Sequence, residues 1–193
     1  MHWFFQFLRR KNLIPKSTRL ISVSPLSDDL LGITHEELLF YFQDHIAAAA
    51  KHLSFSKEEM LQGIKLWYNG YSYDGKTFLY NPFSLLSFFL HKELTNYWFA
   101  TGTPTFLVKS IRDSGVNPTE FIHKEVPDTF FAKFSLEELD MTGLLFQTGY
   151  LTIKEIKRKQ YRNRYFLNYP NEEVRQSIMY NLVEEWVKTN RSS

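Results

Sequence analysis

The chain has 193 residues, enough for one sizeable domain or two small ones, and its 44% hydrophobic and 17% aromatic content excludes a disordered segment. The 23 Lys and Arg residues against 21 Asp and Glu give a net charge of +2, which excludes a general attraction to nucleic acid or anionic lipid. The absence of cysteine excludes disulfide scaffolds, thiolate zinc sites and cysteine nucleophiles, and it is consistent with a cytoplasmic protein.

The N-terminal residues 1–8 are apolar, but they are far fewer than the roughly 18 residues that a membrane span needs. The charged residues 9–11 follow this apolar run, whereas a signal peptide carries its charges in front. We therefore expect a helix packed on a neighbouring element and no association with a membrane.

Two capping boxes predict a helical hairpin. Thr34 with Glu37 begins a helix that should run to about His52, and Ser56 with Glu59 begins a second one. Asn69 and Gly70 predict a left-handed stop after this second helix.

A short β-hairpin is predicted next, over residues 71–80, with a type I′ turn at Asp74 and Gly75. Asn81-Pro82 and Thr103-Pro104 should each begin a further helix, because Pro is tolerated at the first helical position.

The C-terminal part alternates helices and strands. Ser135 with Glu138 predicts a helix that Gly149 ends, residues 150–153 and 161–167 read as strands, and Asn171 begins a closing helix. The sequence therefore predicts a mainly α fold with small β-hairpins, in the α+β class. We predict four divisions. Residues 1–30 form a separate N-terminal segment, and residues 31–116 form a helical lid-like subdomain with the short hairpin. Residues 117–134 form a linker, and residues 135–190 form a winged-helix-like subdomain.

Residues 70–77 match the phosphate-loop pattern G-x-x-x-x-G-K-[ST], in which Lys76 would contact phosphates and Thr77 would contact Mg²⁺. That mechanism needs a strand before the loop and a helix that starts at the Gly-Lys pair, so that the helix dipole faces the phosphates. Here a predicted helix precedes the loop, and Pro82 delays the next helix. We therefore interpret the segment as a hairpin turn, with a working phosphate loop as the alternative.

A second pattern, Pro127-Asp128 followed by Glu155 and Lys157, imitates the metal-dependent nucleases, whose carboxylates hold a divalent ion. A predicted helix separates the two halves, and Glu155 is expected near a hairpin tip, so an exposed acidic side chain is the favoured interpretation. The histidines lack metal-binding helical spacing. We expect no catalytic, cofactor or metal residues.

A local cluster of cations lies in the proposed wing, with Lys154 before it and tyrosines among its members. Such a wing could neutralise nucleic-acid phosphates, or it could simply be solvated. The candidate nucleic-acid residues are Lys157, Arg158, Lys159, Arg162 and Arg164.

Five strings occur in order along the chain and together carry a family resemblance. They are W-Y-N-G-Y-S-Y at 67–73, Y-N-P-F-S-L-L at 80–86, Y-W-F-A-T-G-T-P at 97–104, L-F-Q-T-G-Y-L-T at 145–152 and Y-P-N-E-E-V-R at 169–175. The chain resembles the bacterial AAA-ATPase-like family over roughly residues 31–187. Members of this family often carry a C-terminal PD-(D/E)XK nuclease-like domain.

The resemblance implies that nucleotide binding belongs to an α/β domain before these strings, and that a nuclease-like domain follows them. ATP and Mg²⁺ are thus implied only for a full-length relative, and none of the family's phosphate or magnesium ligands corresponds to a position here. We expect a fragment, a truncated gene product or a domain-sized split protein whose partner is the missing ATPase core or nuclease-like domain. The positions expected to contact that core are Asn69, Tyr71, Asn81, Tyr97 and Trp98.

The leading functional hypothesis is a noncatalytic module that couples or regulates a nucleotide-binding core absent from this chain. One alternative is a DNA-binding module that acts through the basic wing. Another alternative is that one of the two enzyme-like patterns is functional, which would make the chain an ATPase or a nuclease.

Overall fold

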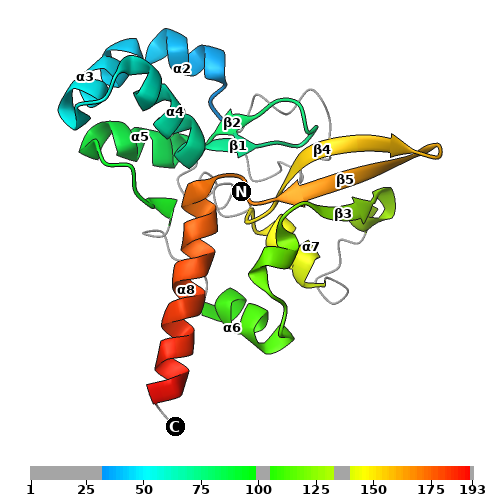
Figure 1. Ribbon diagram of the computed structural model, residues 1–193. Helices are drawn as coiled ribbons and strands as arrows, with labels where there is room; N and C mark the ends of the chain where they lie inside the picture. Colours follow the sequence, from blue (N-terminus) through cyan, green and yellow to red (C-terminus); the bar gives the residue numbers. More distant parts are fainter. Residues whose placement is uncertain (1–31, 99–104, 133–139, 192–193) are drawn as a thin grey trace, which may run out of the picture.

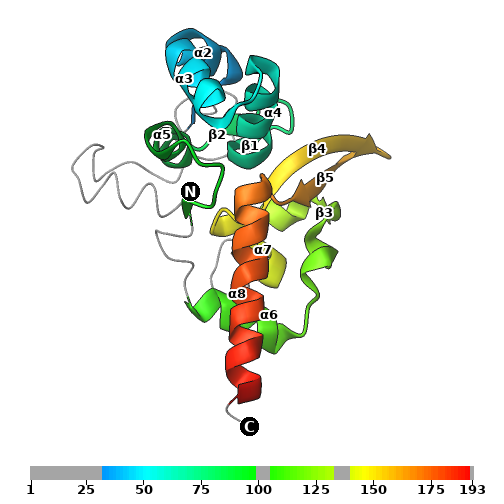
Figure 2. The same ribbon diagram turned by 60° about the vertical axis from the view of Figure 1, so that its left-hand side comes forward.

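The computed structural model describes residues 32–98, 105–132 and 140–191, and they form a mixed α and β structure of the α+β class (Figure 1). The helices of residues 35–91 gather at one end, a small sheet lies on one side, and a long C-terminal helix runs along the molecule (Figures 1 and 2). We call the part made by residues 32–98 the helical unit and the part made by residues 105–191 the sheet unit.

The helical unit contains α2 (His35–Tyr41), α3 (Gln43–Leu53), α4 (Lys57–Tyr68) and α5 (Pro82–His91). Both predicted capping boxes are confirmed: the Thr34 and Ser56 hydroxyls accept the N3 backbone N–H groups, and Glu37 and Glu59 reach back to the caps. The first predicted helix is divided at Phe42, whose φ of −117° departs from helical geometry. Its ring stacks on Phe89 with centroids 5.2 Å apart, so the break turns this ring toward α5.

The β-hairpin of the helical unit is shorter than expected and has a longer connection. Its strands are β1 (Asn69–Tyr71) and β2 (Leu79–Tyr80), paired antiparallel. The predicted type I′ turn is wrong, because Gly75 has φ +68° whereas Asp74 is not among the residues of positive φ, and that turn needs both. Helix α4 ends at Tyr68, where Asn69-Gly70 predicted the stop, but Asn69 is extended (φ −89°, ψ 160°) and Gly70 has φ +125°, so the chain passes directly into β1.

The sheet unit consists of α6 (Thr105–Ser114), η3 (Pro118–Phe121), β3 (Lys124–Pro127), η4 (Asp128–Ala132), α7 (Met141–Gln147), β4 (Thr152–Lys159), β5 (Arg162–Asn168) and α8 (Glu172–Arg191). Its three strands form an antiparallel sheet in the order β3-β5-β4. One face of the sheet packs on Phe130, Phe131 and Phe146 through Val126, Ile153 and Leu167. The sheet unit is therefore built around a three-stranded sheet rather than a simple hairpin.

The expected linker, residues 117–134, supplies strand β3, which pairs with β5 from Lys124 opposite Leu167 to Pro127 opposite Arg164. Four residues offer too short an alternation to be recognised alone. The next helix, α7, begins at Met141 with an Asp140 cap, while the predicted cap at Ser135 lies outside the described residues. The predicted stop at Gly149 is confirmed by its φ of +82°. None of the described helices is both long and apolar enough to cross a membrane.

Candidate functional site

A buried junction joins the helical unit to the sheet unit. We define the junction as residues 69–72, 81–84, 95–98, 150–154 and 169–173, in which each of the five sequence strings is represented. In the ribbon, β1 and the end of α4 lie beside the first turn of α8 and the start of β4 (Figure 1), in agreement with the contacts below. Segments far apart in the sequence therefore meet at one place.

The carboxylate of Glu173 crosses the junction from the first turn of α8. It is fully buried, and its Oε1 accepts the backbone N–H groups of Tyr97 and Trp98, both at 2.8 Å. Burial raises the pKa of Glu173 to about 7, and the two N–H groups only partly oppose this effect. Ser84 of α5, also fully buried, lies beside the carboxylate without completing a hydrogen bond to its Oε2.

Lys154 makes a second connection, from the base of β4. Its Nζ donates to the carbonyl oxygens of Gly70 at 3.0 Å and Pro170 at 2.6 Å, and burial lowers its pKa to about 8. The register of β4 against β5 shifts between Ile153 and Glu155, so Lys154 occupies a β-bulge. A bulge re-aims a side chain, which explains why this lysine turns into the junction rather than joining the surface cations.

The backbones themselves approach closely at Gly70. Its φ is +125°, and a Cβ atom at this position would lie 1.9 Å from the Pro170 carbonyl oxygen. Two residues along, Ser72 donates its N–H to Thr152 Oγ1 at 2.8 Å, and this hydroxyl donates to the Ser72 carbonyl at 2.7 Å. Near β1 the junction is thus held by two backbone contacts. The contact with Pro170 requires glycine at position 70, and the contact with Ser72 uses the hydroxyl group of Thr152.

Aromatic rings fill the remaining space. The ring of Tyr71 stacks on Trp98 with centroids 5.7 Å apart and an interplanar angle of 11°, and Trp98 contacts Tyr150 at 6.0 Å. Tyr71 comes from the helical unit, yet it packs within the core of the sheet unit. The two units therefore share one continuous interior.

The five positions expected to contact an ATPase core also have contacts within the chain. Asn69 and Tyr71 are buried, and Asn81 caps α5 through Oδ1 to the Phe83 N–H at 2.9 Å. Tyr97 donates its hydroxyl to the Glu93 carbonyl at 2.9 Å, and its backbone, like that of Trp98, binds Glu173. These side chains have a structural explanation within the chain.

Two groups at the junction, Glu173 and Lys154, were not among the candidates from the sequence. Glu173 looks like an ordinary acidic residue in the first turn of a helix, where the helix dipole favours it. A sequence signal does exist, because Tyr169-Pro170 before it and Val174 after it are apolar. Lys154 could not be separated from the following surface lysines without knowledge of the bulge.

The phosphate-loop pattern is organised around its own carboxylate. Asp74 Oδ1 accepts the backbone N–H groups of Lys76 and Thr77, both at 2.8 Å, and Oδ2 accepts the Thr77 hydroxyl at 3.1 Å. These hydrogen bonds hold the pKa of Asp74 below its usual value, although partial burial, the largest single influence, raises it. The backbone N–H groups that would bind a phosphate, and the Thr77 hydroxyl that would bind Mg²⁺, are thus engaged by Asp74.

The nuclease-like residues lie in one sheet without converging. Asp128 follows β3 and binds its neighbour Thr129 at 2.8 Å, whereas Glu155 is on β4 and pairs with Lys157 at 2.9 Å. Strand β5 separates β3 from β4. Glu155 lies opposite Phe166 in mid-strand, so its expected position near the hairpin tip is wrong. No group of three or more potential metal ligands is gathered among the described residues.

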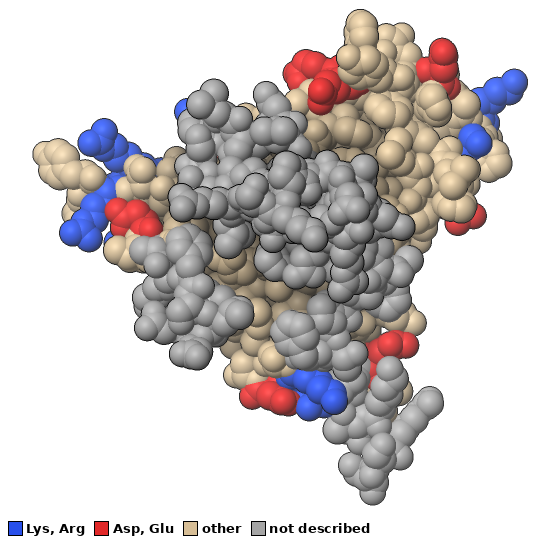
Figure 3. All heavy atoms as spheres, turned by 180° about the vertical axis from the view of Figure 1, so that it is seen from behind, with Lys and Arg blue, Asp and Glu red and all other residues tan. Residues whose placement is uncertain are grey.

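All five candidate nucleic-acid residues lie on the β4–β5 hairpin, which projects from the body of the molecule (Figure 1). The pairs Lys157–Arg164 and Lys159–Arg162 are in register on one face, while Arg158 points to the other face opposite Asn163. Seen from behind, Lys and Arg side chains gather at this projecting end (Figure 3). The acidic partners of these cations on the first face are Glu125, bound by Lys159 at 3.0 Å and by Arg164 at 3.6 Å, and Glu155, bound by Lys157 at 2.9 Å.

Comparison with known proteins identifies a relative but no family. No family model matches the chain, and no solved structure matches it. An uncharacterized protein of the vnfD 5′ region of Azotobacter chroococcum mcd 1 is 40% identical over 115 residues. The match covers 60% of this chain and 22% of that protein, so the chain spans only about a fifth of the length of its relative.

Proposed function

We propose that the chain is a noncatalytic coupling module of an AAA-ATPase-like protein, which acts on a nucleotide-binding core outside this chain. The observation that carries the proposal is the buried junction, where Glu173 and Lys154 bind backbone groups of other segments. A packed and hydrogen-bonded connection moves as one body, so a displacement of the helical unit is transmitted to the sheet unit. The helical unit would then serve as the lid-like part.

The loop at residues 70–77 supports a noncatalytic role. Its N–H groups at Lys76 and Thr77 already bind a carboxylate of the same loop, so a phosphate would have to displace Asp74. It is also followed by β2 rather than by a helix N-terminus, which would favour an anion. Nucleotide binding by the proposed complex is therefore assigned to the missing core.

We also propose a winged-helix-like arrangement for the sheet unit. Its order of α6, β3, α7, β4 and β5, with sheet order β3-β5-β4, supports this proposal. Helix α7 would occupy the place of a recognition helix, yet its sequence M-T-G-L-L-F-Q has no cation, and its Leu145 is fully buried. In this arrangement α7 packs the core, and contacts to other molecules fall to the β4–β5 hairpin.

ATP hydrolysis tests the coupling proposal. We would measure it for the purified chain, for the full-length Azotobacter relative, and for the relative with the chain added in excess. The expected results are no hydrolysis by the chain and an altered rate of the relative, because the added module competes for the same core. A Glu173→Ala chain, with its junction weakened, should alter the rate less. The proposal would be overturned if the chain hydrolysed ATP and lost this activity in Lys76→Ala. It would also be overturned if the added chain left the hydrolysis rate of the relative unchanged.

A second candidate function is nucleic-acid binding through the β4–β5 hairpin. The observation that favours it is the run from Ile156 to Asn171, which holds five cations and no acidic residue. Phosphate contacts release counterions, so the affinity should fall steeply as salt rises. Replacing Lys157, Arg158 and Lys159 together by Ala should weaken binding and flatten this dependence, whereas a flat response of the unmodified chain would exclude the function.

A further inference from the structure

The tip of the β4–β5 hairpin holds an aromatic residue in an unfavourable backbone conformation. Lys159 and Arg162 pair across the end of the strands, which leaves a two-residue loop of Gln160 and Tyr161. Both loop residues have positive φ, 45° and 70° respectively, as in a type I′ turn. Asn-Gly or a similar pair normally fills such a turn, because residues with a large side chain are strained there.

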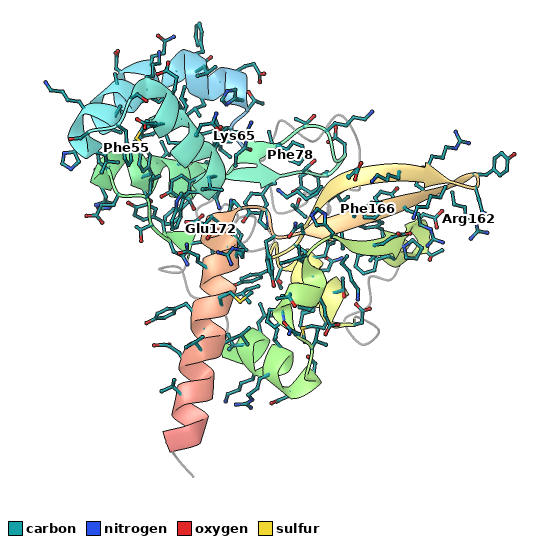
Figure 4. All side chains as sticks on the ribbon, in the orientation of Figure 1. Phe55, Lys65, Phe78, Arg162, Phe166 and Glu172 are labelled. Carbon is teal, nitrogen blue, oxygen red and sulfur yellow. The ribbon has the colours of Figure 1, made fainter. Side chains whose placement is uncertain are left out.

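This strained residue is also the most solvent-exposed of the large hydrophobic side chains in the described part. The Tyr161 side chain has 93% of its surface exposed, so no packing contact explains why a tyrosine is present. Figure 4 shows the neighbouring Arg162 at the far end of the hairpin, away from the helices. A residue that is strained and unsupported by packing suggests a role outside the chain itself.

The charges around the ring indicate what kind of partner it meets. Arg158, Lys159 and Arg162 lie within three residues of Tyr161, and all three are exposed. Lys159 is held by Glu125, while the described residues provide no ion-pair partner for Arg158 or Arg162. An exposed ring between free cations fits a ligand that offers flat π-faces at intervals along an anionic backbone.

We propose that Tyr161 stacks on an unpaired base of a single-stranded nucleic acid, while Arg158 and Arg162 neutralise the adjacent phosphates. The inference rests on the second proposed function and specifies its ligand. In a duplex the base faces are already stacked on one another, so the ring gains this contact only with single strands. A membrane surface fits less well, because the polar residues Gln160 and Asn163 flank the tip where apolar anchors would be needed.

The test measures binding of the full chain to a fluorescein-labelled oligothymidine, and to the same strand annealed to its complement, by fluorescence anisotropy. Tyr161→Gly should lower affinity for the single strand about tenfold or more and leave duplex binding unchanged. Tyr161→Phe keeps the ring and should retain the affinity. Tyr41→Ala, which removes a 68% exposed tyrosine from α2, is the matched control and should have no effect.

The Tyr161→Gly variant should keep the fold, because glycine is favoured in the turn, and its melting temperature should equal or exceed that of the unmodified chain. If Tyr161→Gly binds the single strand as tightly as the unmodified chain, with steep salt dependence preserved, the stacking inference is wrong and the binding function stands. If neither oligonucleotide binds, both are wrong. Binding to phosphatidylserine vesicles in place of oligonucleotides would also overturn the inference.

Discussion

The substitution Glu173→Gln tests the junction through the pH dependence of stability. Burial raises the pKa of Glu173 from 4.5 to about 7. Between these two values the folded chain holds a proton that the unfolded chain releases, so the free energy of unfolding falls as pH rises. One pKa unit corresponds to about 1.4 kcal/mol, so this group removes up to about 3 kcal/mol between pH 4.5 and pH 7.5.

Glutamine keeps an oxygen that accepts the Tyr97 and Trp98 N–H groups, and its amide can donate to the Ser84 hydroxyl beside Oε2. It does not titrate, so the variant should lose the fall in stability and be the more stable protein at pH 7.5. Urea unfolding followed by tryptophan fluorescence, at intervals from pH 4.5 to pH 7.5, measures this difference. Glu58→Gln, which changes an exposed carboxyl group in α4, is the control.

The Glu173→Ala variant separates the hydrogen bonds from the charge. At pH 5 the carboxyl group is largely protonated, so its removal relieves little charge burial, whereas two partly buried N–H groups lose their acceptor. We expect a loss of about 2 to 4 kcal/mol at this pH. The reasoning would be refuted if Glu173→Gln had the same pH dependence as the unmodified chain, or if Glu173→Ala were as stable as it.

Two further substitutions test the backbone of β1 and the loop that follows. Gly70→Ala should cost at least about 3 kcal/mol, because its Cβ would overlap the Pro170 carbonyl, whereas Gly115→Ala, with φ +65° but nothing within 4 Å, should cost only about 1 kcal/mol. Thermal melting compares the two, and equal losses would contradict the close approach. Asp74→Ala should cost about 1 to 2 kcal/mol because it leaves the loop N–H groups without their acceptor. In urea unfolding, Lys76→Ala should change the free energy of unfolding much less than Asp74→Ala does. A larger loss for Lys76→Ala than for Asp74→Ala would restore the phosphate-loop interpretation.

The junction gives a structural reason for the residues of the five sequence strings. The strings meet in pairs: Gly70 lies against the Pro170 carbonyl, the Tyr71 ring stacks on Trp98, and the Trp98 N–H donates to Glu173. Their residue types are thus required by internal packing, whatever the function of the whole protein. The surface of the β4–β5 hairpin, in contrast, has no such internal requirement at Tyr161.

The sequence by itself determined the features that depend on a few neighbouring residues. The capping boxes at Thr34 and Ser56, the Asn81-Pro82 start of α5 and the Gly149 stop follow from hydrogen bonds and φ angles within one turn. For the same reason the cations of residues 157–164 could be placed on one hairpin, since the two strands are adjacent in the chain.

Only the tertiary structure decided the features that depend on distant partners. Strand β3 is recognisable because β5 pairs with it, and the first predicted helix divides at Phe42, whose ring packs on Phe89. The bulge in β4 turned Lys154 inward, and the N–H groups of Tyr97 and Trp98 made Glu173 a buried acceptor. These outcomes depend on contacts between segments up to 84 residues apart, and local residue preferences carry no information about such contacts.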